Sequence, residues 1–246
     1  MPTTVAIAGL TGKFAQCIAS SLQAYPDVFI RGYCRSPQKL PHSLLLVRNI
    51  KVIKDEIDDR VAARLFVKEA NVVICCYFGS SAVMVQGQKI LIDACEELNV
   101  PRKYLASKGT VAGVHILTGG LMETFWSEFF GCWDCTSRSL SFWGTGEETW
   151  DLIIYETAAA YTAAVALDKS AVGVLRFRGD CKTILEIKDC FEKVYTVPFN
   201  LPEAQLGDIL DNDCYESVQA TDLRAFFLSH AVDELHCADQ ELGYRN

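Results

Sequence analysis

The chain has 246 residues, half of them hydrophobic, which is enough for one substantial core and a small appendage. Its formal net charge of −8, without a local cluster of Lys and Arg, disfavours binding to nucleic acid. No apolar run reaches the roughly 18 to 20 residues of a membrane span, and no signal peptide precedes the apolar run Val5–Leu10. We therefore expect a cytoplasmic protein that binds neither nucleic acid nor membrane.

The first hundred residues alternate short β-branched runs with helical periods, which is typical of a parallel sheet flanked by helices. Leu91, Ala94, Cys95 and Leu98 follow a helical spacing within Val83–Leu98, so we expect these side chains to face the sheet. Strands are predicted at Thr4–Ala8, Val28–Cys34, Ile50–Lys54, Asn71–Cys76 and Lys103–Ala106.

The second half of the chain continues with shorter elements. Thr183 and Glu186 have the spacing of a capping box, which predicts a helix from there to about Val194. An alanine-rich helix is predicted at Thr157–Leu167, and strands at Val114–Thr118, Leu140–Trp143 and Val172–Arg178. We expect a Rossmann-type core at 1–137 and a small, shortened C-terminal substrate region at 138–246.

A glycine turn directly follows the first predicted strand. Gly9 and Gly12 begin a G-x-x-G-x-x-A spacing that opens a helix, the context in which backbone N–H groups and a helix dipole bind a dinucleotide pyrophosphate. The alternative is a plain tight turn. The nucleotide reading predicts cofactor contacts from the turn and from the end of the Asn71–Cys76 strand, at Gly9, Thr11, Gly12, Lys13, Phe14, Cys76 and Tyr77.

Arg35 stands at the end of the second predicted strand, where NAD-specific folds place an acidic residue for the ribose hydroxyls. A guanidinium suits a 2′-phosphate through charge-assisted hydrogen bonds, and Lys39 supplies a second cation beside Ser36. We therefore predict NADP(H) rather than NAD(H), the alternative being a solvated surface arginine. Asp58 and Asp59 are compatible with either an adenine contact or simple solvation.

The eleven cysteines are interpreted as reduced thiols, because Cys17, Cys75, Cys76 and Cys95 lie in apolar patterns of a chain too long for a disulfide scaffold. Cys132 and Cys135 have CxxC spacing, but no second pair follows to complete four metal ligands. No metal site is expected.

Several motifs arrive together in order: Val5–Ala15, Cys34-Arg35-Ser36, Asn71–Cys76, Val114–Glu123, Phe142–Gly146, Thr157–Asp168 and Val174–Gly179. Over about three-quarters of the chain they resemble the NmrA-like, isoflavone-reductase-like branch of the atypical short-chain dehydrogenases. The resemblance implies a Rossmann domain and, in many members, NADPH-dependent reduction of small aromatic or secondary metabolites.

Two segments depart from that family. Its catalytic lysine lies on a helix after the fifth strand, but here only the seven residues Ser107–Gly113 separate Ala106 from Val114. They span roughly 23 Å when extended, too little for a helical crossover. Ser107 and Lys108 remain the catalytic candidates, against an ordinary loop lysine. The helices that cap the substrate pocket also look shortened between Gly207 and His230.

A reduced substrate pocket is predicted from Gly120, Met122, Phe125, Trp126 and Tyr155, the alternative being that these side chains close a core. Three functions stay open: an NADPH-dependent reductase of a small hydrophobic or aromatic metabolite, a non-catalytic NADP(H)-sensing regulator, and a non-redox enzyme such as an isomerase or cyclase. The expected partners are a small molecule or nucleotide effector, with a protein partner or a homo-oligomer also open.

Overall fold

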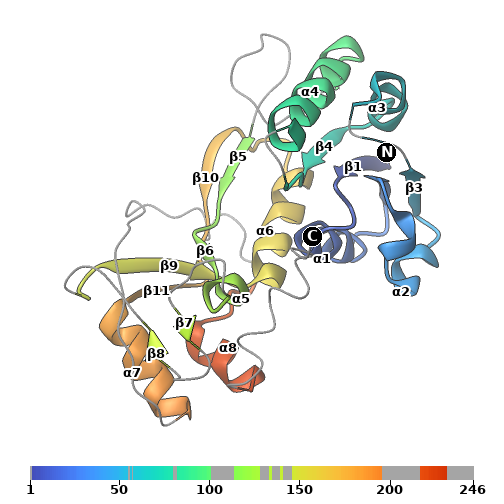
Figure 1. Cartoon of the computed structure of the whole chain (residues 1–246). Coiled ribbons are helices and arrows are strands. Elements are labelled where there is room, and N and C mark those ends of the chain that lie inside the picture. Colours follow the sequence, from blue (N-terminus) through green and yellow to red (C-terminus); the bar gives the residue numbers. More distant parts are fainter. Residues whose placement is uncertain are drawn as a thin grey trace. The chain divides into compact units, whose positions relative to one another are not determined.

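A computed structural model describes residues 2–54, 56, 58–79, 82–100, 114–127, 133–134, 139–140, 146–195 and 217–231 of the chain (Figure 1). The chain divides into two compact units, unit 1 (Met1–His115 and Thr162–Leu175) and unit 2 (Ile116–Tyr161 and Arg176–Asn246). The boundary predicted after residue 137 falls in 135–138, outside the described residues.

Unit 1 is built on a four-stranded parallel sheet in the order β3-β2-β1-β4. Its strands are β1 (Thr3–Ala8), β2 (Val28–Cys34), β3 (Ile50–Lys54) and β4 (Val72–Cys75). The β-branched runs of the sequence form these strands, with Val5, Ala6, Ile7 and Ala8 of β1 fully buried at the centre. This order confirms the predicted α/β class with a Rossmann-type sheet; the strand predicted at Lys103–Ala106 lies outside the described residues.

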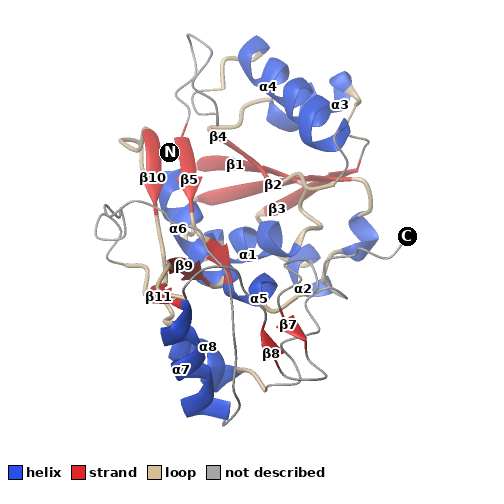
Figure 2. Cartoon of the chain, turned by 60° about the vertical axis from the view of Figure 1, so that its left-hand side comes forward, coloured by secondary structure: helices blue, strands red, loops and turns tan. Residues whose placement is uncertain are grey.

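Helices cover both faces of this sheet: α3 and α4 lie on one face, and α1 lies on the other (Figure 2). Leu91, Ala94 and Cys95 are buried, as their spacing predicts, but Leu98 is 41% exposed. The prediction for Leu98 is wrong because the helix ends at Glu97 and Leu98 is its C-cap. The helical segments are α1 (Lys13–Leu22), η1 (Pro37–Lys39), α2 (His42–Leu45), α3 (Arg60–Val67), the π-helical turn η2 (Ala82–Gly87) and α4 (Gln88–Glu97).

Helix α3 is fixed at both ends by side chains. The Asp59 carboxylate accepts hydrogen bonds from the Val61 and Ala62 N–H groups, so it serves as the N-cap. At the other end the Arg31 guanidinium, from β2, donates to the carbonyl oxygens of Phe66 (2.9 Å) and Lys68. Asp59, for which the sequence left two roles open, thus has a structural one.

Unit 2 contains a small mixed sheet in the order β11-β9-β6. The Thr183 N–H donates to the Glu186 carboxylate and the Glu186 N–H to the Thr183 hydroxyl, which confirms the capping box at the start of the next helix, α7 (Ile184–Tyr195). The other elements are β6 (Gly120–Leu121), α5 (Met122–Phe125), β7 (Trp133–Asp134), β8 (Ser139–Leu140), β9 (Thr149–Ile153), β11 (Asp180–Thr183) and α8 (Leu223–Ser229).

Three elements contribute residues to both units: β5 (Val114–Leu117), α6 (Tyr155–Leu167) and β10 (Gly173–Arg176). They correspond to the predicted strands at Val114–Thr118 and Val172–Arg178 and to the predicted helix at Thr157–Leu167. Helix α6 is apolar nearly all round, as its run of alanines suggests, and most of its side chains are buried.

The core of unit 2 is aromatic. The Trp126 ring lies with its centroid 4.9 Å from that of Phe125, 5.4 Å from that of Phe227 and 5.6 Å from that of Phe191. Helices α5, α7 and α8 each contribute to this cluster, so a segment close to the C-terminus completes the core. No helix of the described chain is long and apolar enough to cross a membrane.

Candidate nucleotide-binding site

The glycine turn between β1 and α1 is held by the backbone of β2. The Gly9 and Leu10 N–H groups both donate to the Tyr33 carbonyl oxygen, at 2.9 and 3.2 Å, and the Gly12 N–H donates to the Gly9 carbonyl oxygen at 2.9 Å. Gly9 has a φ of +79°, a left-handed conformation that favours glycine. The turn is therefore anchored by backbone hydrogen bonds at the carboxyl end of β1.

Two glycines permit the close packing around this turn. A Cβ atom on Gly9 would lie 2.6 Å from the Cys76 carbonyl oxygen, and one on Gly32 would lie 2.2 Å from Cδ2 of Leu10. The turn thus packs against the chain after β4 on one side and over β2 on the other. Sequence reasoning overlooked Gly32, although an isolated glycine inside an apolar strand is a recognised sign of close backbone approach.

Helix α1 begins at this turn with an open N-terminus. Its N-cap, Gly12, has no side chain to accept a hydrogen bond, and its first turn has no acidic residue. The helices α3, α7 and α8 of the same chain are instead capped by their own Asp59, Thr183 and Asp222 side chains. The positive end of the α1 dipole is thereby left available to an anion.

The residues around that N-terminus are accessible. Gly12 is exposed, while Thr11, Lys13 and Phe14 are half-buried. The Thr11 N–H makes no hydrogen bond within the described residues, whereas the Thr11 carbonyl oxygen accepts one from the Gln16 side chain at 2.9 Å. The structure therefore offers a phosphate one free backbone donor, one hydroxyl and a helix dipole at the same place.

The segment after β2 presents two cations. Arg35 and Lys39 are exposed and make no hydrogen bond or ion pair through their side chains within the described chain. Ser36, which is half-buried, is the N-cap of η1, and its carbonyl oxygen accepts the Lys39 N–H at 3.0 Å. The structure thus uses neither cation to stabilise the fold, and their role toward a 2′-phosphate stays a prediction.

The chain after β4 forms the other wall of the turn. The Cys76 N–H donates to the Ala8 carbonyl oxygen at 2.9 Å, which continues the β1–β4 pairing by one residue. Burial raises the pKa of the Cys75 thiol to about 11 and that of the Cys76 thiol to about 12, and it also raises the pKa of the Tyr77 hydroxyl. All three groups are therefore uncharged at neutral pH and do not repel a phosphate.

The residues predicted to contact substrate lie in unit 2. Gly120 is in β6, paired with Leu152, and the side chains of Met122, Phe125 and Trp126 have at most 1% exposed surface. Tyr155, 5% exposed, starts α6 and donates its N–H to the Glu123 carboxylate at 2.8 Å. These side chains belong to or border the core, and their part in a substrate pocket stays a prediction.

The candidate catalytic residues Ser107 and Lys108 lie in 101–113, outside the described residues, as do Cys132 and Cys135. Within the described ranges, no group of three or more His, Cys, Asp or Glu side chains is placed to hold a metal ion. The geometry on which the site rests is therefore that of the glycine turn.

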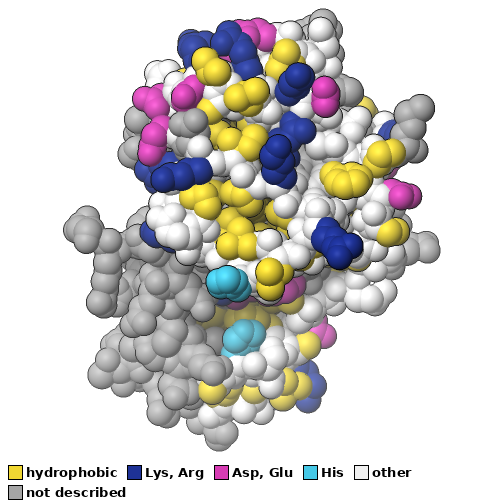
Figure 3. Space-filling model, turned by 90° about the vertical axis from the view of Figure 1, so that its right-hand side faces the viewer, with side chains coloured by type: hydrophobic (Ala, Val, Ile, Leu, Met, Phe, Trp, Pro, Cys, Tyr) yellow, Lys and Arg dark blue, Asp and Glu magenta, His cyan; other side chains and the backbone are white. Residues whose placement is uncertain are grey.

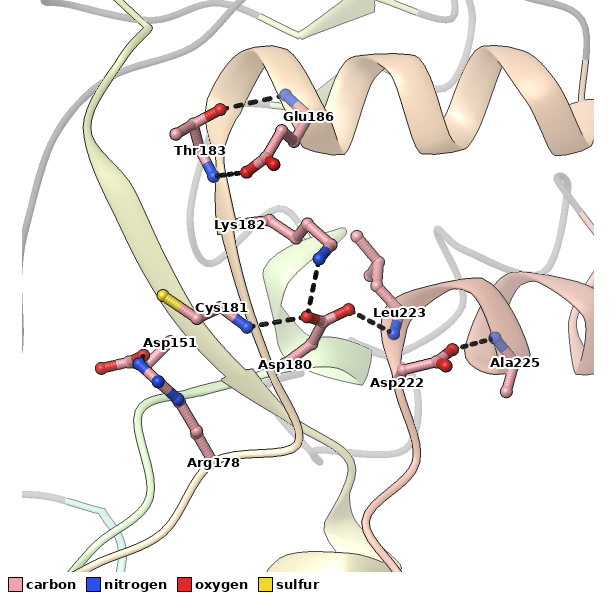
Figure 4. Close-up of polar contacts among 10 residues, drawn as sticks. All are labelled: Asp151, Arg178, Asp180, Cys181, Lys182, Thr183, Glu186, Asp222, Leu223 and Ala225. Carbon is pink, nitrogen blue, oxygen red and sulfur yellow. Dashed lines mark hydrogen bonds and ion pairs between the residues drawn. The ribbon is translucent and has the colours of Figure 1, made fainter. Parts of the chain in front are cut away.

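Unit 2 also contains a polar network that the sequence did not indicate (Figure 4). The buried Asp151 carboxylate pairs with the Arg178 guanidinium at 2.8 Å. Asp180 accepts hydrogen bonds from the N–H groups of Cys181 (2.8 Å) and Leu223 (3.0 Å) and pairs with Lys182 at 3.0 Å. This network ties β9, β11 and α8 together, so we assign it a structural role.

No protein-family model matches this chain, and no curated protein matches it. Several solved structures are similar to it. One is a UDP-glucuronic acid 4-epimerase from Bacillus cereus in complex with UDP-glucuronic acid and NAD, with a TM-score of 0.68 at 12% identity, covering 95% of this chain and 99% of that one. A dTDP-glucose 4,6-dehydratase from Bacillus anthracis in complex with NAD has a TM-score of 0.65 at 12% identity, covering 94% and 96% of the two chains.

An NADPH-dependent quinone oxidoreductase from Escherichia coli, complexed with NADPH, has a TM-score of 0.63 at 15% identity, covering 97% of this chain and 90% of that one. Identities this low show the fold alone. The chain therefore has a Rossmann fold like that of these three enzymes.

Proposed function

We propose that this chain binds a nicotinamide dinucleotide at the carboxyl end of β1. The observation that carries the proposal is the Gly9–Gly12 turn, which the Tyr33 carbonyl oxygen anchors and which opens α1 without a side-chain cap. A pyrophosphate at this N-terminus would accept a hydrogen bond from the Thr11 N–H and would be attracted by the positive end of the helix dipole. The bound NAD or NADPH of the three similar structures supports the same ligand class.

We infer a preference for NADP(H) from Arg35 and Lys39. Both are exposed and have no side-chain partner in the described part of the chain, and both follow β2, where an acidic residue would be expected for NAD(H). A 2′-phosphate would give the planar Arg35 guanidinium a doubly charged partner that can accept two of its hydrogen bonds. Cys76 and Tyr77 would line the opposite side of the nucleotide site without adding charge.

The activity that we propose is NADPH-dependent reduction of a small hydrophobic or aromatic metabolite, as in the NmrA-like, isoflavone-reductase-like branch that the sequence resembles. NADPH, when bound, supplies the hydride. The chain's own task is to orient the cofactor and the substrate and to provide a proton, for which Ser107 and Lys108 are the candidates.

A second candidate, nucleotide binding without turnover, is favoured by one observation. Met122, Phe125 and Trp126, predicted to contact substrate, have at most 1% of their surface exposed and pack against α7 and α8. A core that is closed in this way presents no apolar surface from these residues to a substrate. The chain would then act as an NADP(H) sensor.

Titration calorimetry with NADPH and NADH tests the binding proposal. We expect NADPH to bind at least about 10-fold more tightly, since one charge-assisted interaction is worth about 1.5 to 3 kcal/mol, and R35A to narrow the difference. R48A is the matched control, because Arg48 is also exposed and has no partner among the described residues, but it precedes β3 at the other end of the strand. Equal affinities for the two nucleotides would refute the NADP(H) assignment.

Turnover separates the two candidates. NADPH oxidation, followed by absorbance with a panel of aromatic ketones, enones and quinones, is expected for the reductase. Binding that persists while every compound of the panel leaves NADPH unconsumed would favour the sensor.

A further inference from the structure

The segment from Val28 to Lys54 contains positively charged side chains and no negatively charged ones. This segment contains six of the chain's 23 Lys and Arg residues and none of its 31 Asp and Glu residues. Five of the six cations, all except Arg31, are exposed and make no hydrogen bond or ion pair with their side chains in the described chain: Arg35, Lys39, Arg48, Lys51 and Lys54. On the side of the molecule drawn in Figure 3, Lys and Arg side chains, together with several Asp and Glu side chains, lie around a band of hydrophobic ones.

The parallel pairing of β2 and β3 divides these cations between the two ends of the sheet. Cys34 and Lys54 form the last pair of the register, so Lys54 lies one strand spacing, about 4.8 Å, from the end of β2, where Arg35 follows. Arg48 precedes β3, and Lys51 is paired with Arg31, farther from that end. Only Arg35, Lys39 and Lys54 therefore belong to the carboxyl end, where ligands of Rossmann folds bind.

The faces of the sheet place Lys54 on the side of the glycine turn. Paired residues share a face, so Lys54 lies on the face of Cys34 and Gly32, and Gly32 contacts Leu10 of the turn. Tyr33, on the opposite face, packs its ring against Phe66 of α3 at a centroid distance of 5.0 Å. Lys54 and the open N-terminus of α1 thus share one face of the sheet.

The described carboxylates that follow Lys54 do not provide it with a partner; Asp55, the next residue, lies outside the described residues. The Asp59 carboxylate is the N-cap of α3. The Glu56 carbonyl oxygen accepts a hydrogen bond from the Tyr33 hydroxyl at 2.5 Å, on the α3 face of the sheet. Glu56 and Asp58 are exposed, and neither forms an ion pair with Lys54. Three like charges at one end of the sheet, none of them paired with a carboxylate of the described chain, repel one another, and a bound anion would reduce that cost.

We propose that Lys54 is a third cation of the 2′-phosphate subsite, and that with Arg35 and Lys39 it makes the site selective for 2′-phosphorylated nucleotides. The inference rests on the proposed dinucleotide function. It goes further in naming a residue of β3, outside the loop after β2, that distinguishes NADPH from NADH. Lys54 is a specificity residue and takes no part in the chemistry.

The test compares full-length K54Q with the parent protein by calorimetry, with NADPH, NADH, 2′,5′-ADP and 5′-AMP as ligands at one low salt concentration. We expect K54Q to lower the affinity for NADPH and 2′,5′-ADP about 3- to 10-fold and to leave the affinity for NADH and 5′-AMP unchanged. K51Q, which removes a cation from the same strand away from the carboxyl end, is the matched control and should change none of the four. K54R should keep the parent's preference.

Each outcome decides between the two proposals. An equal loss of NADPH and NADH affinity in K54Q, or no loss of either, with a parent that prefers NADPH, would overturn the role of Lys54 and leave the proposed function standing. A parent that binds NADPH and NADH equally would overturn the 2′-phosphate subsite but not dinucleotide binding. A parent that binds none of the four ligands would overturn both proposals. Thermal denaturation is the control for folding: if K54Q has the same melting temperature as the parent, the substitution has left the fold intact.

Discussion

Replacing Gly9 by alanine should damage the fold, whereas the same change at Gly12 should damage only the site. A left-handed conformation costs a non-glycine residue about 1 to 2 kcal/mol, and at Gly9 φ is +79°. The added Cβ would also lie 2.6 Å from the Cys76 carbonyl oxygen, which is backbone and cannot rotate away. Overpacking of this kind costs about 1 to 3 kcal/mol, so we expect G9A to lower the free energy of unfolding by about 2 to 5 kcal/mol.

G12A is the matched control for that prediction. Gly12 has an ordinary φ of −71°, and its added Cβ would meet only the Gly9 carbonyl oxygen, at 3.4 Å. Its stability should therefore stay within about 1 kcal/mol of the parent, because the loss of a glycine N-cap and the stiffer unfolded chain nearly offset each other. Its methyl group projects from an exposed position at the α1 N-terminus, where we place the pyrophosphate, so NADPH affinity should fall.

Urea denaturation followed by circular dichroism measures the stability of both variants, and calorimetric titration with NADPH measures binding. A G9A protein as stable as the parent would refute the packing argument. A G12A protein with parental affinity for NADPH would refute the placement of the pyrophosphate at this turn.

Three further predictions concern stability. R31M removes the side-chain donors to the carbonyl end of α3 and should cost about 1 to 2 kcal/mol in urea denaturation; K51M on the neighbouring strand should cost little, and equal losses would contradict this. D59A removes the α3 N-cap and should cost about 1 kcal/mol, with D59N restoring most of it; a fully stable D59A would count against the cap. The folded pKa values of Cys75 and Cys76, about 11 and 12 against an ordinary 9, mean that the unfolded chain loses these protons first. The free energy of unfolding should therefore decrease as the pH rises from about 9 to 11. This decrease should be smaller in the double variant C75A/C76A, and an unchanged slope in that variant would contradict the prediction.

Local patterns in the sequence are enough to locate many elements of this fold. The strands at Val28–Cys34 and Ile50–Lys54 and the capping box at Thr183 and Glu186 form as predicted, because period-two apolar runs and cap spacings act over a few residues. Helix α3 was not predicted, since its eight residues carry only a short apolar pattern, although Asp59 before them is a start signal.

The candidate site divides in the same way. The glycine turn is visible in the sequence because Gly9 and Gly12 directly follow a strand, but its anchor is not: the Tyr33 carbonyl oxygen comes from a strand more than twenty residues farther along the chain. The cations between Val28 and Lys54 are too widely spaced to be recognised as a cluster, and only the β2–β3 register places Lys54 beside Arg35.

The sequence by itself thus determines the Rossmann class, most of the strands and the position of the glycine turn, since these depend on backbone preferences and apolar periodicity within short windows. Only the tertiary structure decides which side chains make contacts that stabilise the fold and which remain accessible to a ligand. Arg31 is used at the end of α3 while Arg35 and Lys54 are not, and Met122 and Trp126 are enclosed by helices from far along the chain. Such assignments depend on contacts between distant segments, and no local pattern encodes them.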